Sequence, residues 1–135
     1  MALYLADTSA WHRSGQAEEL WSSLLDEDAL ALCGPVTLEL LYSARGPADY
    51  RGLSRALSYL PTLPLDARAE ALAARTQAAL AERSRHRGPT PVDLLVAGVA
   101  EAHGATLLHY DRHFDLIARV TGQPAEWLAR RGSLD

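Results

Sequence analysis

The sequence predicts an α/β sandwich in which helices flank a short, mainly parallel central sheet. Leu and Ala supply 24 residues each, whereas Val and Ile together supply only 6, and this balance favours helix over strand. Short apolar runs alternate with longer segments of helical periodicity, as in βαβ units. The 135 residues contain no internal repeat, low-complexity tract or linker. We therefore expect a single domain that spans residues 1–135.

The first part of the chain is predicted to contain two strands separated by helical segments. Short apolar runs at residues 3–6 and 30–33 predict the strands. An Asp-Thr-Ser segment ends the first strand and starts a turn or a short helix. Residues 16–26, 37–45 and 49–60 carry apolar side chains at helical spacing. In the second of these helices, Leu38, Leu41 and Tyr42 share one face.

The second part carries clear signals for the starts and ends of helices. Asp66 is placed as an N-cap, and Thr90 followed by Pro91 combines a cap with a proline at the first helical position. Gly104 supplies a helix end. These signals divide the region into a strand at residues 62–65, an Ala-rich helix to about residue 83, a basic loop at 84–91, a buried helix at 92–103, a strand at 106–110, a helix to about residue 120 and a tail at 123–135.

Composition and charge exclude several classes of protein. No apolar run approaches the length of a membrane span, and the acidic, Arg-free start does not resemble a signal peptide. Cys33 is the single cysteine, so an internal disulfide is impossible and a reducing cytoplasm is the expected compartment. The net charge of −4 argues against a generally basic nucleic-acid-binding surface. Any binding of nucleic acid must therefore be local or assisted by a metal ion.

Four acidic residues from distant segments are predicted to meet at one edge of the sheet. Asp7 and Asp111 follow strands, whereas Glu39 and Asp93 lie in the first turns of helices. Strand carboxyl ends and helix N-termini share the edge at which parallel α/β folds bind their ligands. Converging carboxylates raise one another's pKa, and a divalent cation would relieve that repulsion. Ligation by oxygen alone favours Mg²⁺ or Mn²⁺, with one or two ions at the site.

Each of these acids also has a simpler structural interpretation. Asp93 lies three residues after Thr90 and suits a capping box. Asp7 is a common turn former, and Asp111 suits a helix cap. Glu39 is the most informative of the four because its sequence neighbours are apolar, a setting in which a carboxylate needs a partner. The convergence of all four is therefore a stronger signal than any one of them.

Basic residues near these acids are candidates for contacts with nucleic-acid phosphates. They lie in the loop before Asp93 and directly after Asp111. The alternative is a solvated helix end whose arginines favour the C-terminal helix dipole. His109 is expected to be an orienting or buried polar group rather than a metal ligand. The candidates for these phosphate contacts are Arg83, Arg85, Arg87, Arg112 and His113.

Three motifs of the sequence resemble the PIN-domain ribonucleases of the VapC toxin type. They are LADTSAW at the start, TLELLYSAR around Glu39, and VDLLVAGVAEAHGATLLHYDRHFDLIA from Asp93 through Asp111. The resemblance extends from Leu3 to about Trp127. It implies a PIN-like α/β/α fold and a metal-dependent endoribonuclease that cuts structured RNA, such as tRNA or rRNA, and so stops translation. It also implies a VapB-like antitoxin as partner, and a homodimer.

The resemblance assigns roles to particular residues of this chain. Asp7, Glu39, Asp93 and Asp111 match the acidic quartet of the family. Thr8 and Ser9 match the small hydroxyl residues that support the first acid. The family also suggests water, rather than the RNA 2′-hydroxyl, as the nucleophile.

One departure concerns the position two residues after the fourth acid, where many relatives carry a further acid. This chain has His113 there, with Asp115 two residues farther on. The role of Asp115 at a second metal therefore stays open.

Three alternatives to a toxin remain open. The chain could be a PIN nuclease that acts on other RNA or DNA without an antitoxin. It could be a catalytically inactive PIN domain that serves as a binding module, although the intact quartet argues against this. The third alternative is a helical protein in which the acids are placed by coincidence.

Overall fold

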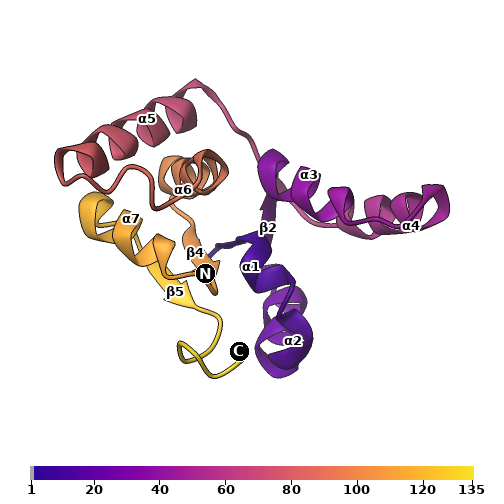
Figure 1. The fold of residues 1–135 in the computed structure, drawn as a ribbon. Helices are drawn as coiled ribbons and strands as arrows, with labels where there is room; N and C mark the ends of the chain where they lie inside the picture. Colours follow the sequence, from indigo (N-terminus) through magenta and orange to yellow (C-terminus); the bar gives the residue numbers. More distant parts are fainter. Residues whose placement is uncertain (1) are drawn as a thin grey trace.

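The computed structural model describes residues 2–135, in which helices separate successive strands along the chain (Figure 1). The strands are β1 (Tyr4–Ala6), β2 (Leu30–Cys33), β3 (Thr62–Leu63), β4 (Thr106–His109) and β5 (Ala125–Trp127). The helices are α1 (Thr8–Trp11), α2 (Glu18–Asp26), α3 (Gly34–Tyr42), α4 (Pro47–Leu57), α5 (Ala67–Glu82), α6 (Pro91–His103) and α7 (His113–Thr121), with a short 3₁₀ turn at Ser14–Gln16. None of the helices in this part of the chain is long and apolar enough to cross a membrane.

The strands of the described residues form one sheet in the order β3-β2-β1-β4-β5, and every neighbouring pair is parallel. The predicted α/β/α fold is therefore confirmed, with a sheet that is wholly rather than mainly parallel. Strand β1 lies at the centre, where Tyr4 is in register with Leu30 on one side and with Thr106 on the other. Because all strands run the same way, their carboxyl ends lie at one edge.

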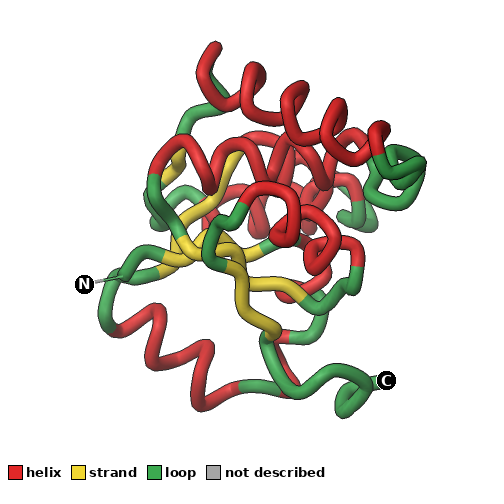
Figure 2. Tube along the Cα trace, turned by 90° about the vertical axis from the view of Figure 1, so that its left-hand side faces the viewer, coloured by secondary structure: helices red, strands yellow, loops and turns green. Residues whose placement is uncertain are grey.

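Helices lie on both sides of the sheet (Figure 2). The two faces of the sheet bury different sets of apolar side chains. Leu5 and Leu107 belong to the larger core, which includes residues of α3, α5, α6 and α7. Ala6 and Leu108, their sequence neighbours, belong to a second core with Trp21 of α2. This alternation follows from the two-residue period of a strand, and it gives the molecule its three layers.

Helix caps form where the sequence predicts them. The Asp66 side chain accepts a hydrogen bond from the Ala69 N–H, and Thr90 and Asp93 form a complete capping box at the start of α6. Gly104 ends that helix in the left-handed conformation with φ of 66°. Helix α6 also packs closely on α5, because a Cβ at Gly98 would lie 2.5 Å from the Ala69 carbonyl oxygen.

Helix α3 differs from its prediction in its start and in its exposed face. It begins at Gly34 rather than residue 37, because Pro35 suits the first turn of a helix. Its buried residues are Val36 and Leu40, whereas Leu38 and Tyr42 are 69% and 92% exposed. The apolar face marked by Leu38 and Tyr42 is thus turned away from the core.

The C-terminal segment is more ordered than the predicted tail. Residues Ala125–Trp127 form β5, an edge strand that pairs with β4 through Leu107, Leu108 and His109. This strand was not predicted, because only its last residue is strongly apolar. Trp127 and Leu128 anchor the segment, and Leu128 is buried against the smaller core.

Candidate active site

The acidic quartet begins with Asp7, which directly follows β1 and caps α1. The Asp7 side chain accepts a hydrogen bond of 3.0 Å from the Ser9 N–H and is only 4% exposed. The Ser9 hydroxyl accepts a 2.9 Å hydrogen bond from the Tyr110 N–H. Ser9 thus holds the ends of β1 and β4 together and fixes the position of Asp7 relative to Asp111.

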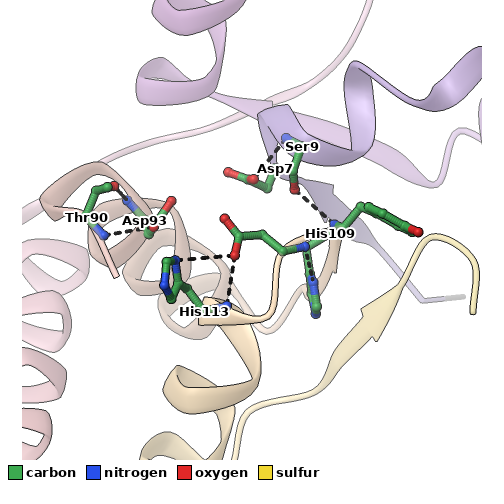
Figure 3. A network of polar contacts seen from close by, with 8 residues as sticks. Asp7, Ser9, Thr90, Asp93, His109 and His113 are labelled. Atoms are coloured by element: carbon green, nitrogen blue, oxygen red, sulfur yellow. Dashed lines mark hydrogen bonds and ion pairs between the residues drawn. The ribbon is translucent and has the colours of Figure 1, made fainter. Parts of the chain in front are cut away.

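Asp93 and Asp111 approach each other across the edge of the sheet. Each offers one ligand atom, and so does His113, with these three atoms all within 4.8 Å of one another. Figure 3 shows Asp7, Asp93 and His113 arranged around a shared space. The structure therefore brings these side chains together from β1, α6 and the β4–α7 junction.

His113 contacts Asp111 directly. Its backbone N–H donates a 2.9 Å hydrogen bond to Asp111 Oδ1, and its ring Nδ1 lies 3.3 Å from the same oxygen. His113 was predicted only to contact RNA, whereas it lies beside the carboxylates. The signal was available in the sequence, because a residue two positions after a strand-terminal Asp is within reach of an Asx turn.

The charged forms of Asp7 and Asp93 are disfavoured where they lie. Burial is the main cause that raises the pKa of Asp7, and the charges of Asp93 and Glu39 raise it further, while hydrogen bonds from Ser9 lower it. Burial likewise raises the pKa of Asp93, with a contribution from Asp111 that opposes the hydrogen bonds from Thr90. The expected mutual effect of the acids has the correct sign, but burial is the larger cause.

Glu39 lies on the exposed side of α3 and has the polar partner that its apolar setting led us to expect. The Thr8 hydroxyl donates a 2.8 Å hydrogen bond to Glu39 Oε1. Thr8 therefore positions Glu39, while its neighbour Ser9 positions Asp7. The surroundings of Glu39 are apolar but open to solvent, because its neighbour Leu38 is itself exposed.

Asp93 combines the capping role with its place among the acids. Its Oδ2 accepts a 2.9 Å hydrogen bond from the Thr90 N–H, and its own N–H donates to the Thr90 hydroxyl at 3.1 Å. The carboxylate still lies within reach of Asp111 and His113. The capping box thus fixes the side chain in an orientation that serves the acidic group.

His109 is buried behind Asp111. Its Nδ1 accepts a 3.3 Å hydrogen bond from the Asp111 N–H, and within residues 2–135 its Nε2 has no hydrogen-bond partner. The ring centroid lies 5.2 Å from that of Phe114 and 5.0 Å from that of Trp127. Burial lowers the His109 pKa. A neutral ring that supports the backbone of Asp111 agrees with the expected orienting role.

Asp115 lies outside the acidic group. Its Oδ1 accepts a 3.1 Å hydrogen bond from the Trp127 indole N–H. Among the residues that the structure describes, the group with metal-ligand spacing contains Asp93, Asp111 and His113 but not Asp115. The geometry therefore links Asp115 to β5.

A basic cavity of about 420 Å³ lies next to the acidic group. The predicted RNA-binding residues Arg85, Arg87, Arg112 and His113 all line it, but Arg83 lines only a smaller neighbouring cavity. Two further arginines, Arg119 and Arg131, line the basic cavity but were not predicted from the sequence. Arg119 lies seven residues after Arg112, a helical spacing that could have indicated a shared side. The full lining is Ser84, Arg85, Arg87, Gly88, Arg112, His113, Asp115, Leu116, Arg119 and Arg131.

An apolar groove of about 870 Å³ lies on the other side of the acids. Leu38 and Tyr42 of α3 line it together with Leu95 of α6. Thr8 and Glu39 also line it, so the groove reaches the acidic group. A protein segment that filled this groove would lie against Glu39.

The family model of the PIN domain matches residues 4–120. The chain belongs to the PIN-domain family. This PIN domain is 38% identical to Ribonuclease VapC18 of Mycobacterium tuberculosis over 98% of this chain and 99% of that protein. It is 40% identical to Ribonuclease VapC51 of the same organism over the full length of both.

Solved structures give the same fold. The PIN domain resembles the crystal structure of DNA-bound VapBC from Salmonella typhimurium with a TM-score of 0.76 at 23% identity, over 96% of this chain and 100% of that chain. It resembles VapBC-5 from Mycobacterium tuberculosis with a TM-score of 0.67 at 26% identity, over 94% and 98% of the two chains. The predicted family and fold are thus confirmed.

Proposed function

We propose that this PIN domain is a metal-dependent endoribonuclease and the toxin of a VapBC-like type II toxin–antitoxin system. The observation that carries the proposal is the convergence of Asp7, Asp93 and Asp111 at the carboxyl edge of a parallel sheet. Full-length relatives named Ribonuclease VapC support the activity, and structural neighbours titled VapBC support the pairing with an antitoxin.

The donor set suits a hard divalent cation. Asp93, Asp111 and His113 would hold it, with Asp7 and Glu39 available beside them. The carboxylate majority favours Mg²⁺ or Mn²⁺, as one or two ions. When bound, such an ion offsets negative charge on the attacking and leaving oxygens of an in-line phosphodiester hydrolysis.

The protein's own contribution is to hold these carboxylates in place and charged. Ser9 fixes Asp7, Thr8 orients Glu39, and Thr90 fixes Asp93 through hydrogen bonds. Because burial raises the pKa of Asp7, a cation would also favour its charged form. In this scheme water attacks the phosphorus, and no side chain acts as the nucleophile. The buried Cys33, whose pKa burial raises to about 11, is unsuited to that role.

Structured RNA, tRNA or rRNA, is the proposed substrate, and the cytoplasm is the compartment in which the enzyme would meet it. The arginines of the basic cavity supply the positive charge that the whole chain lacks. The apolar groove is the proposed seat of the antitoxin, because an occupant there reaches Glu39 and could place an arginine against the acids. The homodimer remains a prediction, and the oligomeric state in solution tests it.

A non-toxin PIN nuclease and an inactive binding module are the alternative functions. The groove with its exposed Leu38 and Tyr42 favours a toxin with a protein partner over a nuclease that acts alone. The grouped carboxylates favour an active enzyme over a binding module.

Induced expression in a bacterial host tests the proposal. We expect growth arrest and new discrete 5′ ends in total RNA with the wild-type chain. Asp7→Asn should abolish both, because Asn keeps the hydrogen bond from Ser9 but not the charge. The matched control is Asp26→Asn, an exposed carboxylate at the end of α2. Normal growth and intact RNA with soluble, folded wild-type protein would contradict the toxin assignment.

A further inference from the structure

The basic cavity concentrates positive charge from three separate segments. Arg85 and Arg87 come from the loop after α5, Arg112 and Arg119 come from the start and the last turn of α7, and Arg131 follows β5. The only carboxylate in the lining is that of Asp115, and the Trp127 indole already occupies one of its oxygens. The cavity is therefore strongly cationic on a chain whose net charge is −4.

These arginines form no ion pair among the residues that the structure describes. Across residues 2–135, no carboxylate lies within ion-pair distance of any of the five. Arg131 packs over the Trp127 ring at 5.7 Å, which orients the guanidinium but does not neutralise it. Like charges gathered around one cavity repel one another, and an anionic ligand would remove that cost.

The walls of the cavity are held by backbone contacts. The Arg85 N–H donates to the Leu80 carbonyl at 2.8 Å, and the Gly88 N–H donates to the Arg85 carbonyl at 3.2 Å. A Cβ at Gly88 would lie 3.3 Å from Leu116 Cδ1, so the loop packs tightly on α7 at this point. The backbone segments that carry the loop arginines and the helix arginines are thus packed against each other.

The cavity is continuous with the acidic group. His113 lines the cavity and also contacts Asp111 at 3.3 Å. A volume of about 420 Å³ falls within the range of small-ligand sites and can receive one nucleotide. A strand of RNA cut at the acids would therefore reach the cavity with a neighbouring phosphate.

We propose that the basic cavity binds a phosphate of the RNA strand that flanks the scissile phosphodiester, with Arg119 and Arg131 as principal ligands. Guanidinium groups suit this role because their planar donors match phosphate oxygens in pairs. The inference rests on the proposed ribonuclease function and adds a second anchoring point for its substrate.

A binding experiment with matched charge changes tests the proposal. The double variant Arg119→Gln/Arg131→Gln is compared with Arg68→Gln/Arg75→Gln, which removes two exposed arginines of α5 outside the cavity. The probe is a fluorescein-labelled RNA stem-loop of mixed sequence, bound in EDTA so that it is not cut. The cavity variant should bind it about 10-fold more weakly and lower the slope of log K against log salt by about 0.7–0.9, the contribution of one phosphate contact. The control should keep the wild-type slope.

Chemical removal of single phosphate charges locates the contact. One methylphosphonate linkage at a time is introduced along the same RNA. At the position that the cavity binds, the neutral linkage should weaken binding by the wild-type protein but not by the cavity variant, because both changes remove the same interaction. Equal behaviour of the cavity variant and the α5 control would overturn the proposal.

Two further outcomes separate this inference from the function on which it rests. If the wild-type chain neither binds nor cuts RNA, the proposed function fails, and the inference fails with it. If the cavity variant cuts and binds RNA like the wild type but escapes inhibition by the antitoxin, the cavity receives the protein partner instead. In the expected case, cleavage by the cavity variant shows a raised KM with nearly unchanged kcat.

Discussion

The basic cavity and the apolar groove flank the same acidic group but suit different partners. The cavity of about 420 Å³ touches the acids through His113, and the groove of about 870 Å³ touches them through Thr8 and Glu39. Arginines dominate the first lining, whereas Leu, Tyr, Val and Pro dominate the second. A polyanion fits the first and an apolar protein segment fits the second. Substrate binding and inhibition should therefore be separable by mutation.

The largest expected effect is on RNA cleavage, and it distinguishes the grouped acids from the acid that lines the basic cavity. Asp111→Asn should lower RNA cleavage at least about 100-fold, because supporting residues of metal sites alone contribute about 10–100-fold. Asp115→Asn should lower it less than about 10-fold, since Asp115 bonds to Trp127 and lies outside the acidic group. Initial rates on one RNA substrate with Mn²⁺ measure both. Equal losses would mean that the metal site extends into the cavity.

A smaller effect is expected at the apolar groove. Leu38→Glu places a charge on the exposed apolar face of α3 and should weaken antitoxin binding about 30-fold or more, as loss of about 2 kcal/mol at an interface hot spot does. RNA cleavage by the free protein should stay near the wild-type rate. Tyr59→Ala, exposed but outside the groove, is the control. Co-purification with the antitoxin and titration of its inhibition measure the change.

The smallest effect concerns stability. The Asp7 pKa is raised above 3.8, so the folded state binds this proton more tightly than the unfolded state. The contribution of Asp7 to folding stability is therefore present in acid and is lost as pH rises through its raised pKa. Asp7→Asn should raise Tm at neutral pH by a few °C, the effect of about 1 kcal/mol on a domain of this size.

Thermal scans across pH test this prediction. The difference between wild type and Asp7→Asn should vanish in acid below the ordinary carboxyl pKa. Mn²⁺ should stabilise the wild type more than the variant and so narrow the gap at neutral pH. If Asp7→Asn is less stable than the wild type at neutral pH, the buried charge of Asp7 does not destabilise the folded state, which would contradict this prediction.

The sequence predicted those parts of the fold that local chemistry determines. Apolar runs located β1 and β2, and the Thr90–Asp93 capping box and Gly104 located the two ends of α6. Strand β5 was missed because its pairing with β4, rather than its own composition, makes it a strand. The exposed face of α3 was ambiguous for a related reason, since periodicity shows that a face is apolar but not what covers it.

In the candidate site, too, some features follow from the local sequence and others depend on tertiary contacts. Topology rules placed Asp7 and Asp111 at one edge from the sequence alone. The role of Arg131 could not be predicted, because β5 and the segment after it bring this residue to α7. The sequence indicated that Glu39 needs a polar partner but not that Thr8, 31 positions away, supplies it.

The central position of β1 has a consequence for how the protein is made. Strand β1 pairs with β4, and the Ser9 hydroxyl accepts from the Tyr110 N–H across 101 positions of sequence. During synthesis on the ribosome, Asp7 therefore lacks Asp93 and Asp111 as neighbours until almost the whole protein has emerged. A nascent or truncated chain that lacks β4 cannot assemble the acidic group. A host that makes this protein is thus exposed to its nuclease centre only after synthesis is nearly complete, when an antitoxin made alongside it can already be present.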